Sequence, residues 1–215
     1  MPGMRSLPLP EVSSLMPKLP PKYRAIVAIG VTTGCRITEI VSLRRFDLLT
    51  REGRLKDRIA FVKLKSGKKR RPVTSMPKKE AAVRHRKMSI PESWRCYVLD
   101  HLVREEAKGY DRPDDLVFRG RLGRPLSRQT VYRQFRDLLG EGYGTHWMRK
   151  TFAQELFRYF IRENPGDPMR ALELTRRALG HARLDTTVKY LGITEENIDA
   201  AQRAVFEGGD HGKGS

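Results

Sequence analysis

An apolar segment of helix length, residues 23–33, constrains the fold more than any other feature of the sequence. Most of its residues are apolar, and this pattern predicts a helix buried in a core. Gly34 follows directly and is a typical helix stop, because glycine readily adopts the left-handed conformation that ends many helices. A second helix is predicted to begin at Arg36, with four apolar residues on its core side: Ile37, Ile40, Val41 and Leu43.

The rest of the chain is mostly helical in pattern, with one stretch of strand periodicity. Residues 59–64 and 69–74 are predicted to be strands joined by a basic turn, which makes a β-hairpin. An exposed basic loop is expected at residues 78–87 and a short third strand at 88–90. Further helices are predicted in residues 91–108, 127–139, 145–153, 169–179, 185–190 and 195–206. The sequence therefore predicts a mainly α fold with a small antiparallel β-sheet, in the α+β class.

The two ends of the chain differ in composition from the rest: the N-terminal segment is rich in proline and the C-terminal segment is rich in glycine. Six prolines in residues 1–21 predict an extended N-terminal arm with at most one short helix, around residues 11–16. Residues 22–207 are expected to form a single domain, since the whole chain of 215 residues suits one core. The glycine-rich residues 208–215 are predicted to be a disordered tail.

The net charge of +18 and the pI near 10.3 favour a polyanionic partner. Nucleic acid is favoured over an anionic membrane, because no basic amphipathic helix with an aromatic face stands out. A solubilising surface or a ribosome-associated protein is the alternative. The sequence has no apolar run of the roughly 18 residues that a membrane span needs. Cys35 and Cys96 suit a reducing cytoplasm, and no cysteine–histidine cluster has zinc spacing, so no metal site is predicted.

Residues 179–190 are predicted to contain a break between two helices. Gly180 ends the first helix, and Asp185 or Thr186 begins the next. In one unbroken helix His181 and Tyr190 would lie on opposite sides, whereas the break lets both side chains reach one site.

Three further segments carry residues that suit phosphate chemistry. Arg36 begins a helix and has Glu39 one turn later, a pattern that fits either phosphate binding or an ordinary surface ion pair. Lys65 lies at the turn of the predicted hairpin. The alternative is that this hairpin is cationic only because it is exposed to solvent. His146 and Arg149 lie on one face at the start of a helix that Thr145 is expected to cap, where free amides already favour phosphate.

These four segments, in this order, resemble the motifs of the tyrosine recombinase (phage integrase) family. The resemblance covers Thr-Gly-x-Arg-x-x-Glu, a Lys-x-Gly-Lys-x-Arg hairpin, His-x-x-Arg-Lys-Thr and Leu-Gly-His with a later Tyr, and extends over residues 10–206. It implies the catalytic-domain fold of that family and a site-specific DNA recombinase or integrase. The catalytic residues that it implies are Arg36, Lys65, His146, Arg149, His181 and Tyr190, supported by Glu39.

The resemblance also implies a mechanism and its partners. Tyr190 would attack a phosphodiester and form a 3′-phosphotyrosyl link, with no metal, ATP or other cofactor. The partners would be double-stranded DNA, further copies of the chain (a tetramer on DNA) and accessory DNA-bending or directionality proteins, in the cytoplasm at the nucleoid. Candidate DNA contacts are Lys63, Lys68, Lys69, Arg70, Arg128 and Arg133.

Several alternatives stay open at this point. A type IB topoisomerase would use the same chemistry to relax DNA, and a non-catalytic DNA-binding module would need none of it. Most members of the family carry an additional N-terminal DNA-binding domain. The chain is therefore expected to be either a natural single-domain protein or a fragment.

Overall fold

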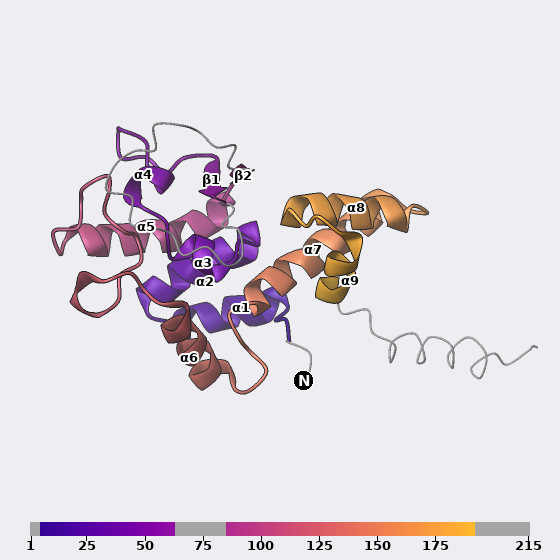
Figure 1. The fold of residues 1–215 in the computed structure, drawn as a ribbon, viewed down its shortest axis with the longest axis horizontal. Helices are drawn as coiled ribbons and strands as arrows, with labels where there is room; N and C mark the ends of the chain where they lie inside the picture. Colours follow the sequence, from indigo (N-terminus) through magenta and orange to yellow (C-terminus); the bar gives the residue numbers. More distant parts are fainter. Residues whose placement is uncertain (1–4, 63–84, 192–215) are drawn as a thin grey trace, which may run out of the picture. The chain divides into compact units, whose positions relative to one another are not determined.

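A computed structural model of the protein describes residues 5–62 and 85–191. The chain divides into two compact units, Met1–Phe152 and Ala153–Ser215, and the boundary falls within one long helix, α7 (Trp147–Glu163). The single domain expected over residues 22–207 stays a prediction. Both units are mostly helical, and the described sheet is small and antiparallel, so the predicted fold class is confirmed (Figure 1).

The first unit is built around α2 (Pro21–Thr33), which the sequence predicted as a buried helix. Five consecutive residues of α2, from Ala25 to Ile29, are fully buried. This helix packs against α5 (Glu92–Glu106), whose Val98 and Leu102 are also buried. Burial on all sides explains why α2 lacks a polar face.

Shorter elements complete the first unit. They are α1 (Leu9–Leu15), the 3₁₀ helix η1 (Met16–Lys18), α3 (Ile37–Ile40), α4 (Arg45–Leu48), η2 (Arg121–Gly123) and α6 (Arg128–Leu139). Phe135 of α6 packs edge-on against Trp147 at the start of α7, with ring centroids 5.7 Å apart. The Phe135 ring also packs against Tyr23 of α2, with ring centroids 6.2 Å apart. These aromatic residues therefore join α2, α6 and the beginning of α7.

The sheet of the described residues consists of β1 (Ile59–Val62) and β2 (His85–Met88) in antiparallel register. Ile59 pairs with Met88 and Val62 with His85. The first strand was predicted; the returning strand expected at residues 69–74 lies outside the described residues. The loop predicted at 78–87 was wrong over residues 85–87, which belong to β2, and its residues 78–84 lie outside the described residues. The strand predicted at 88–90 is present only at Met88, the last residue of β2. This strand is polar and lacks apolar alternation, so its pairing with β1 comes from backbone hydrogen bonds that no side-chain pattern reports.

The N-terminal arm is part of the core of the first unit. Pro8 and Pro10 stand at the beginning of α1, and Pro20 and Pro21 at the beginning of α2, where proline favours helix formation. Leu7 N donates to Thr151 Oγ1 at 3.1 Å, and the Thr151 hydroxyl donates to Leu7 O at 2.8 Å. The buried apolar side chains of this segment are Leu7, Val12, Leu15, Met16 and Leu19. The short helix was predicted near its place, but the arm is not extended.

The second unit contains the rest of α7, then α8 (Pro168–Leu179) and α9 (Leu184–Leu191). Asp167 caps α8, because its carboxylate accepts the Arg170 N–H at 2.8 Å. Helix α8 packs against α9. Among the residues that the structure describes, no helix is long and apolar enough to span a membrane.

Candidate active site

The turn after α2 positions the first arginine. Gly34 takes the left-handed conformation, with φ 59° and ψ 23°, and its N–H donates to Gly30 O at 2.9 Å. Arg36 then precedes α3, and its N–H donates to Glu39 Oε2 at 2.7 Å. The second oxygen, Glu39 Oε1, lies 3.6 Å from Arg36 Nη1. Glu39 is only 7% exposed, so this is not an ordinary pair on the surface; it orients a side chain that stays 37% exposed.

The second arginine of the predicted site, Arg149, reaches the same turn. Its side chain is 1% exposed, and Nη1 donates to the carbonyl oxygen of Gly34. Arg149 lies in the first turn of α7, directly after the fully buried Trp147 and Met148. The hydrogen bond therefore places the Arg149 guanidinium against the backbone two residues before Arg36.

Gly30 and Gly34 allow α7 to approach α2 this closely. A Cβ atom added to Gly30 would lie 2.5 Å from Met148 Sδ, and one added to Gly34 would lie 2.2 Å from Phe152 Cδ1. Both distances are far below van der Waals contact. Small residues at these two positions are thus a condition for the contact between Arg149 and Gly34.

We expect Gly34→Ala to destabilise the protein by about 2–5 kcal/mol. Left-handed backbone costs an L-residue roughly 1–2 kcal/mol, and overpacking against Phe152 adds about 1–3 kcal/mol. Gly53 is a matched control, because it has φ 75° and open space around its Cβ position, so Gly53→Ala should show the backbone cost of roughly 1–2 kcal/mol alone. Urea unfolding of both variants measures the difference. Equal losses of unfolding free energy in the two variants would mean that the Phe152 side chain can move aside without destabilising the protein.

Thr145 does not cap α7 as predicted. The first amide of the helix, Trp147 N, donates instead to Gly144 O at 3.3 Å. Thr145 is 4% exposed, and its hydroxyl makes no hydrogen bond with any residue of the described segments. A cap at Thr145 would have started the helix at residue 146, whereas α7 begins one residue later, at Trp147. A backbone carbonyl takes the place of the expected side-chain acceptor.

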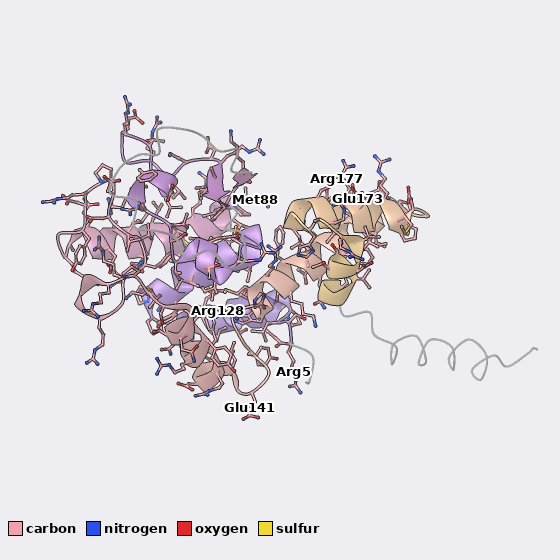
Figure 2. The ribbon with its side chains drawn as sticks, in the orientation of Figure 1. Arg5, Met88, Arg128, Glu141, Glu173 and Arg177 are labelled. Carbon is pink, nitrogen blue, oxygen red and sulfur yellow. The ribbon has the colours of Figure 1, made fainter. Side chains whose placement is uncertain are left out.

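His146, half-buried just before α7, is surrounded by positive charge. Burial lowers the pKa of its imidazole below the usual value of 6.5, and the guanidinium groups of Arg128, Arg149 and Arg36 lower it further. His146 is therefore neutral at pH 7 and able to accept a proton. Arg128, one of the predicted DNA contacts, is exposed at the start of α6 (Figure 2).

The lowered pKa of His146 predicts a pH profile. A base whose pKa is depressed stays neutral as the pH falls through 6.5, so DNA cleavage should decline only at lower pH. Arg128→Gln removes one cause of the depression and should move this acid-side decline to higher pH. The control is Arg136→Gln, an exposed arginine of the same helix, which should leave the decline in place. Cleavage rates at saturating DNA between pH 5 and 8 measure it, and an unmoved decline in Arg128→Gln contradicts the assignment.

The second unit carries the last two residues of the predicted set, His181 and Tyr190. Helix α8 ends at Gly180 in the left-handed conformation, with φ 65° and ψ 31°. The break expected after it is present, and the next helix, α9, begins at Leu184, slightly before the expected start. His181 is 5% exposed, and its Nδ1 lies 3.0 Å from Thr187 Oγ1. Tyr190 lies in the last turn of α9.

The structure thus places some of the predicted residues and not others. Within the first unit it brings together Arg36, Glu39, His146 and Arg149. Arg133 is exposed on α6. Five predicted residues lie outside the described segments: Lys63, Lys65, Lys68, Lys69 and Arg70. Sequence reasoning missed Thr187, although it stands three residues before Tyr190 in a stretch that was singled out.

No group of three or more His, Cys, Asp or Glu side chains within residues 5–62 and 85–191 could hold a metal ion. The described side chains of this region are instead mainly cationic, which suits an anionic ligand.

Comparisons with known proteins agree with the motif resemblance. Residues 6–197 match the family model described as the phage integrase family. Tyrosine recombinase XerC of Bacillus pumilus is 27% identical over 192 residues, which are 87% of this chain and 54% of XerC. The probable integrase/recombinase YoeC of Bacillus subtilis is 26% identical over 183 residues, 83% of this chain and 81% of YoeC.

A solved structure shares the fold. The XerH site-specific recombinase bound to palindromic difH substrate aligns with a TM-score of 0.62 and 20% identity, over 95% of this chain and 54% of that one. The chain spans about half the length of XerC and of the XerH of Campylobacter jejuni.

Proposed function

The chain belongs to the phage integrase family, and from this membership we propose that it is a site-specific recombinase that cuts and rejoins double-stranded DNA through Tyr190. One observation carries the proposal beyond the family. The buried guanidinium of Arg149 is hydrogen-bonded to the Gly34 turn, which also positions Arg36. Two arginines that are distant in sequence are thereby attached to one turn, which supports the proposal that both bind a single phosphate.

In the proposed reaction the arginines bind the scissile phosphate. Each guanidinium is a planar fork that matches two phosphate oxygens, and its charge persists at every physiological pH. Arg36 and Arg149 would bind the non-bridging oxygens, and His181 would add a donor. Fixed donors of this kind stabilise the extra negative charge of the pentavalent transition state.

Tyr190 Oη would form a bond to phosphorus while the bond from phosphorus to the 5′ oxygen breaks. The phenol has an ordinary pKa of about 10, so a base must take its proton, and the neutral His146 is the candidate. Lys65 would donate a proton to the departing 5′ oxygen. The phosphotyrosyl bond keeps the energy of the phosphodiester, so rejoining would need no ATP.

DNA binding would rest on the positive charge of the chain. The net charge of +18 predicts a strongly salt-dependent affinity for duplex DNA. Arg128 and Arg133 are exposed on α6, where both can reach a phosphate backbone. Assembly of several copies on DNA, as a tetramer, and help from accessory DNA-bending or directionality proteins are part of the proposal.

The test is a covalent-adduct assay with nicked duplexes that trap the cut strand. Because the DNA site is not known, overlapping fragments of the DNA that flanks the gene are used. We expect a protein–DNA adduct that survives SDS and forms in EDTA, with the DNA attached at Tyr190 in mass spectra. DNA binding without an adduct on any fragment would favour a binding module. Adduct at a different residue would overturn the assignment of the nucleophile.

A further inference from the structure

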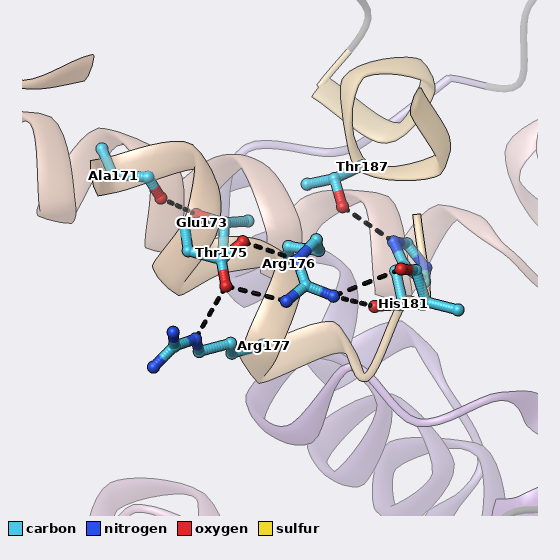
Figure 3. A network of polar contacts seen from close by, with 8 residues as sticks. Ala171, Glu173, Thr175, Arg176, Arg177, His181 and Thr187 are labelled. Carbon is cyan, nitrogen blue, oxygen red and sulfur yellow. Dashed lines mark hydrogen bonds and ion pairs between the residues drawn. The ribbon is translucent and has the colours of Figure 1, made fainter. Parts of the chain in front are cut away.

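Both the backbone N–H and the backbone carbonyl of His181 are hydrogen-bonded at the end of α8. His181 N donates to Arg176 O at 3.1 Å, and Gly180 N donates to Arg177 O at 3.0 Å. These two hydrogen bonds form a Schellman motif. The side chain of Arg176 then returns to the same residue, because its Nη1 donates to His181 O at 2.7 Å (Figure 3). Arg176 thus binds both the N–H and the carbonyl of His181.

Arg176 is itself fixed by Glu173, one turn earlier on α8. Arg176 Nε donates to Glu173 Oε2 at 2.6 Å, and Nη2 donates to Oε1 at 2.7 Å. This paired geometry restricts the guanidinium more than a single contact does. Arg177 Nε adds a hydrogen bond to Oε1 at 2.8 Å, and the two arginines lower the pKa of Glu173 to about 2. The carboxylate therefore stays charged at any pH at which the protein is assayed.

The imidazole of His181 is oriented by a residue from the next helix. Its Nδ1 lies 3.0 Å from Thr187 Oγ1, and Thr187 is fully buried. Thr187 precedes Tyr190 by three residues on α9, so one hydrogen bond joins His181 to the helix that carries the proposed nucleophile. The adjacent Thr186 is exposed.

A hydroxyl beside Nδ1 can select the tautomer of a neutral imidazole. If the hydroxyl donates to Nδ1, the ring proton is on Nε2, which can then donate to an anion. If the hydroxyl accepts from Nδ1, a neutral ring has no proton on Nε2. Only the first arrangement lets His181 assist a phosphate without carrying a positive charge.

We propose that Thr187 is a positioning residue for His181: its hydroxyl donates to Nδ1 and keeps the imidazole proton on Nε2, the nitrogen that would then donate to the scissile phosphate. Arg176, held by Glu173, fixes the backbone of His181 for the same purpose. The proposal rests on the proposed function, because it gives His181 a phosphate to bind. It adds a residue outside the set that the motifs identify.

The tautomer is measured directly by long-range ¹⁵N–¹H spectra of the full chain labelled in its five histidines. His181→Gln assigns the His181 signals by their disappearance. We expect the wild-type ring to be protonated on Nε2, and Thr187→Val to give a mixture of tautomers. Thr187→Ser keeps the hydroxyl and should restore the wild-type pattern. Protonation on Nδ1 in the wild type, or an unchanged pattern in Thr187→Val, overturns the proposal.

Cleavage rates give the second measurement. Thr187→Val should slow adduct formation by about 10- to 100-fold, the usual effect of removing a group that orients a reacting side chain. DNA affinity should not change, and Thr187→Ser should recover most of the rate. Thr186→Val is the matched control and should cleave as the wild type does. In a His181→Gln background, Thr187→Val should have no further effect; an additional loss there would mean a general role in folding.

The two proposals fail in different ways. A wild-type protein that forms no adduct contradicts the proposed function, while the spectra still report the tautomer that Thr187 selects. A wild-type protein that cleaves, together with a Thr187→Val variant that cleaves equally fast, contradicts only the positioning role.

Discussion

Tyr190→Phe is expected to abolish the covalent protein–DNA adduct while DNA binding persists. Phenylalanine keeps the ring and lacks only the oxygen that would attack phosphorus, so no covalent link can form at this position. None of the cationic groups is altered by the substitution, and the electrostatic part of the affinity should therefore be retained. The measurement pairs a gel-shift titration with the SDS-resistant adduct on the same nicked duplex.

Tyr159→Phe is the matched control for this experiment. Tyr159 lies on α7 in the same unit and is 47% exposed, so loss of its hydroxyl should change neither folding nor cleavage. Adduct formation by Tyr190→Phe at the wild-type rate would assign the nucleophile to another residue. Equal loss of DNA binding and adduct would indicate a structural role for the hydroxyl.

Local sequence signals predicted the elements that carry the site. The end of α2 at Gly34 and the break after Gly180 were both predictable, because each depends on a glycine next to a periodic apolar segment. The ion pair of Arg36 with Glu39 follows from their spacing of three residues at the beginning of α3. Such features involve residues within a turn of each other, and their geometry is nearly independent of the rest of the fold.

Contacts between distant segments were not predictable in the same way. The hydrogen bond from Arg149 to Gly34 joins residues 115 positions apart, and the sequence pattern does not indicate that its donor is buried. The sequence also did not predict that the proline-rich arm is buried. Proline can begin a helix or interrupt one, and the sequence alone does not distinguish these two roles. Both outcomes depend on which surfaces the tertiary fold covers.

Thr187 is an intermediate case. It contacts His181 six residues away, so the pair is local in sequence. The contact nevertheless crosses a helix break, and helical periodicity cannot say which side chains meet across a turn of undefined geometry. A buried threonine in α9 was also indistinguishable from its exposed neighbour Thr186 on sequence alone.

Arg149→Lys is expected to lower the cleavage rate by about 10²–10³-fold, the usual effect of removing one preorganised donor to a transition-state oxyanion. Lysine keeps the charge but cannot donate to Gly34 and bind two phosphate oxygens in one plane. The change also removes a charged hydrogen bond from a buried position, so stability should fall by about 1–3 kcal/mol. Single-turnover cleavage and urea unfolding measure the two effects separately.

The size of the two losses decides what Arg149 does. Arg158→Lys is the control on the same helix, since Arg158 is 60% exposed and pairs only with Glu155 among the ion pairs found in the described residues; neither rate nor stability should change. A stability loss with wild-type cleavage would make Arg149 a structural cation that fastens α7 to the Gly34 turn. Rate loss at saturating DNA, in a variant that is still folded at the assay temperature, is what phosphate binding by Arg149 requires. Since the Gly34 carbonyl holds the guanidinium in place, Gly34→Ala should reproduce part of that rate loss without altering any charge.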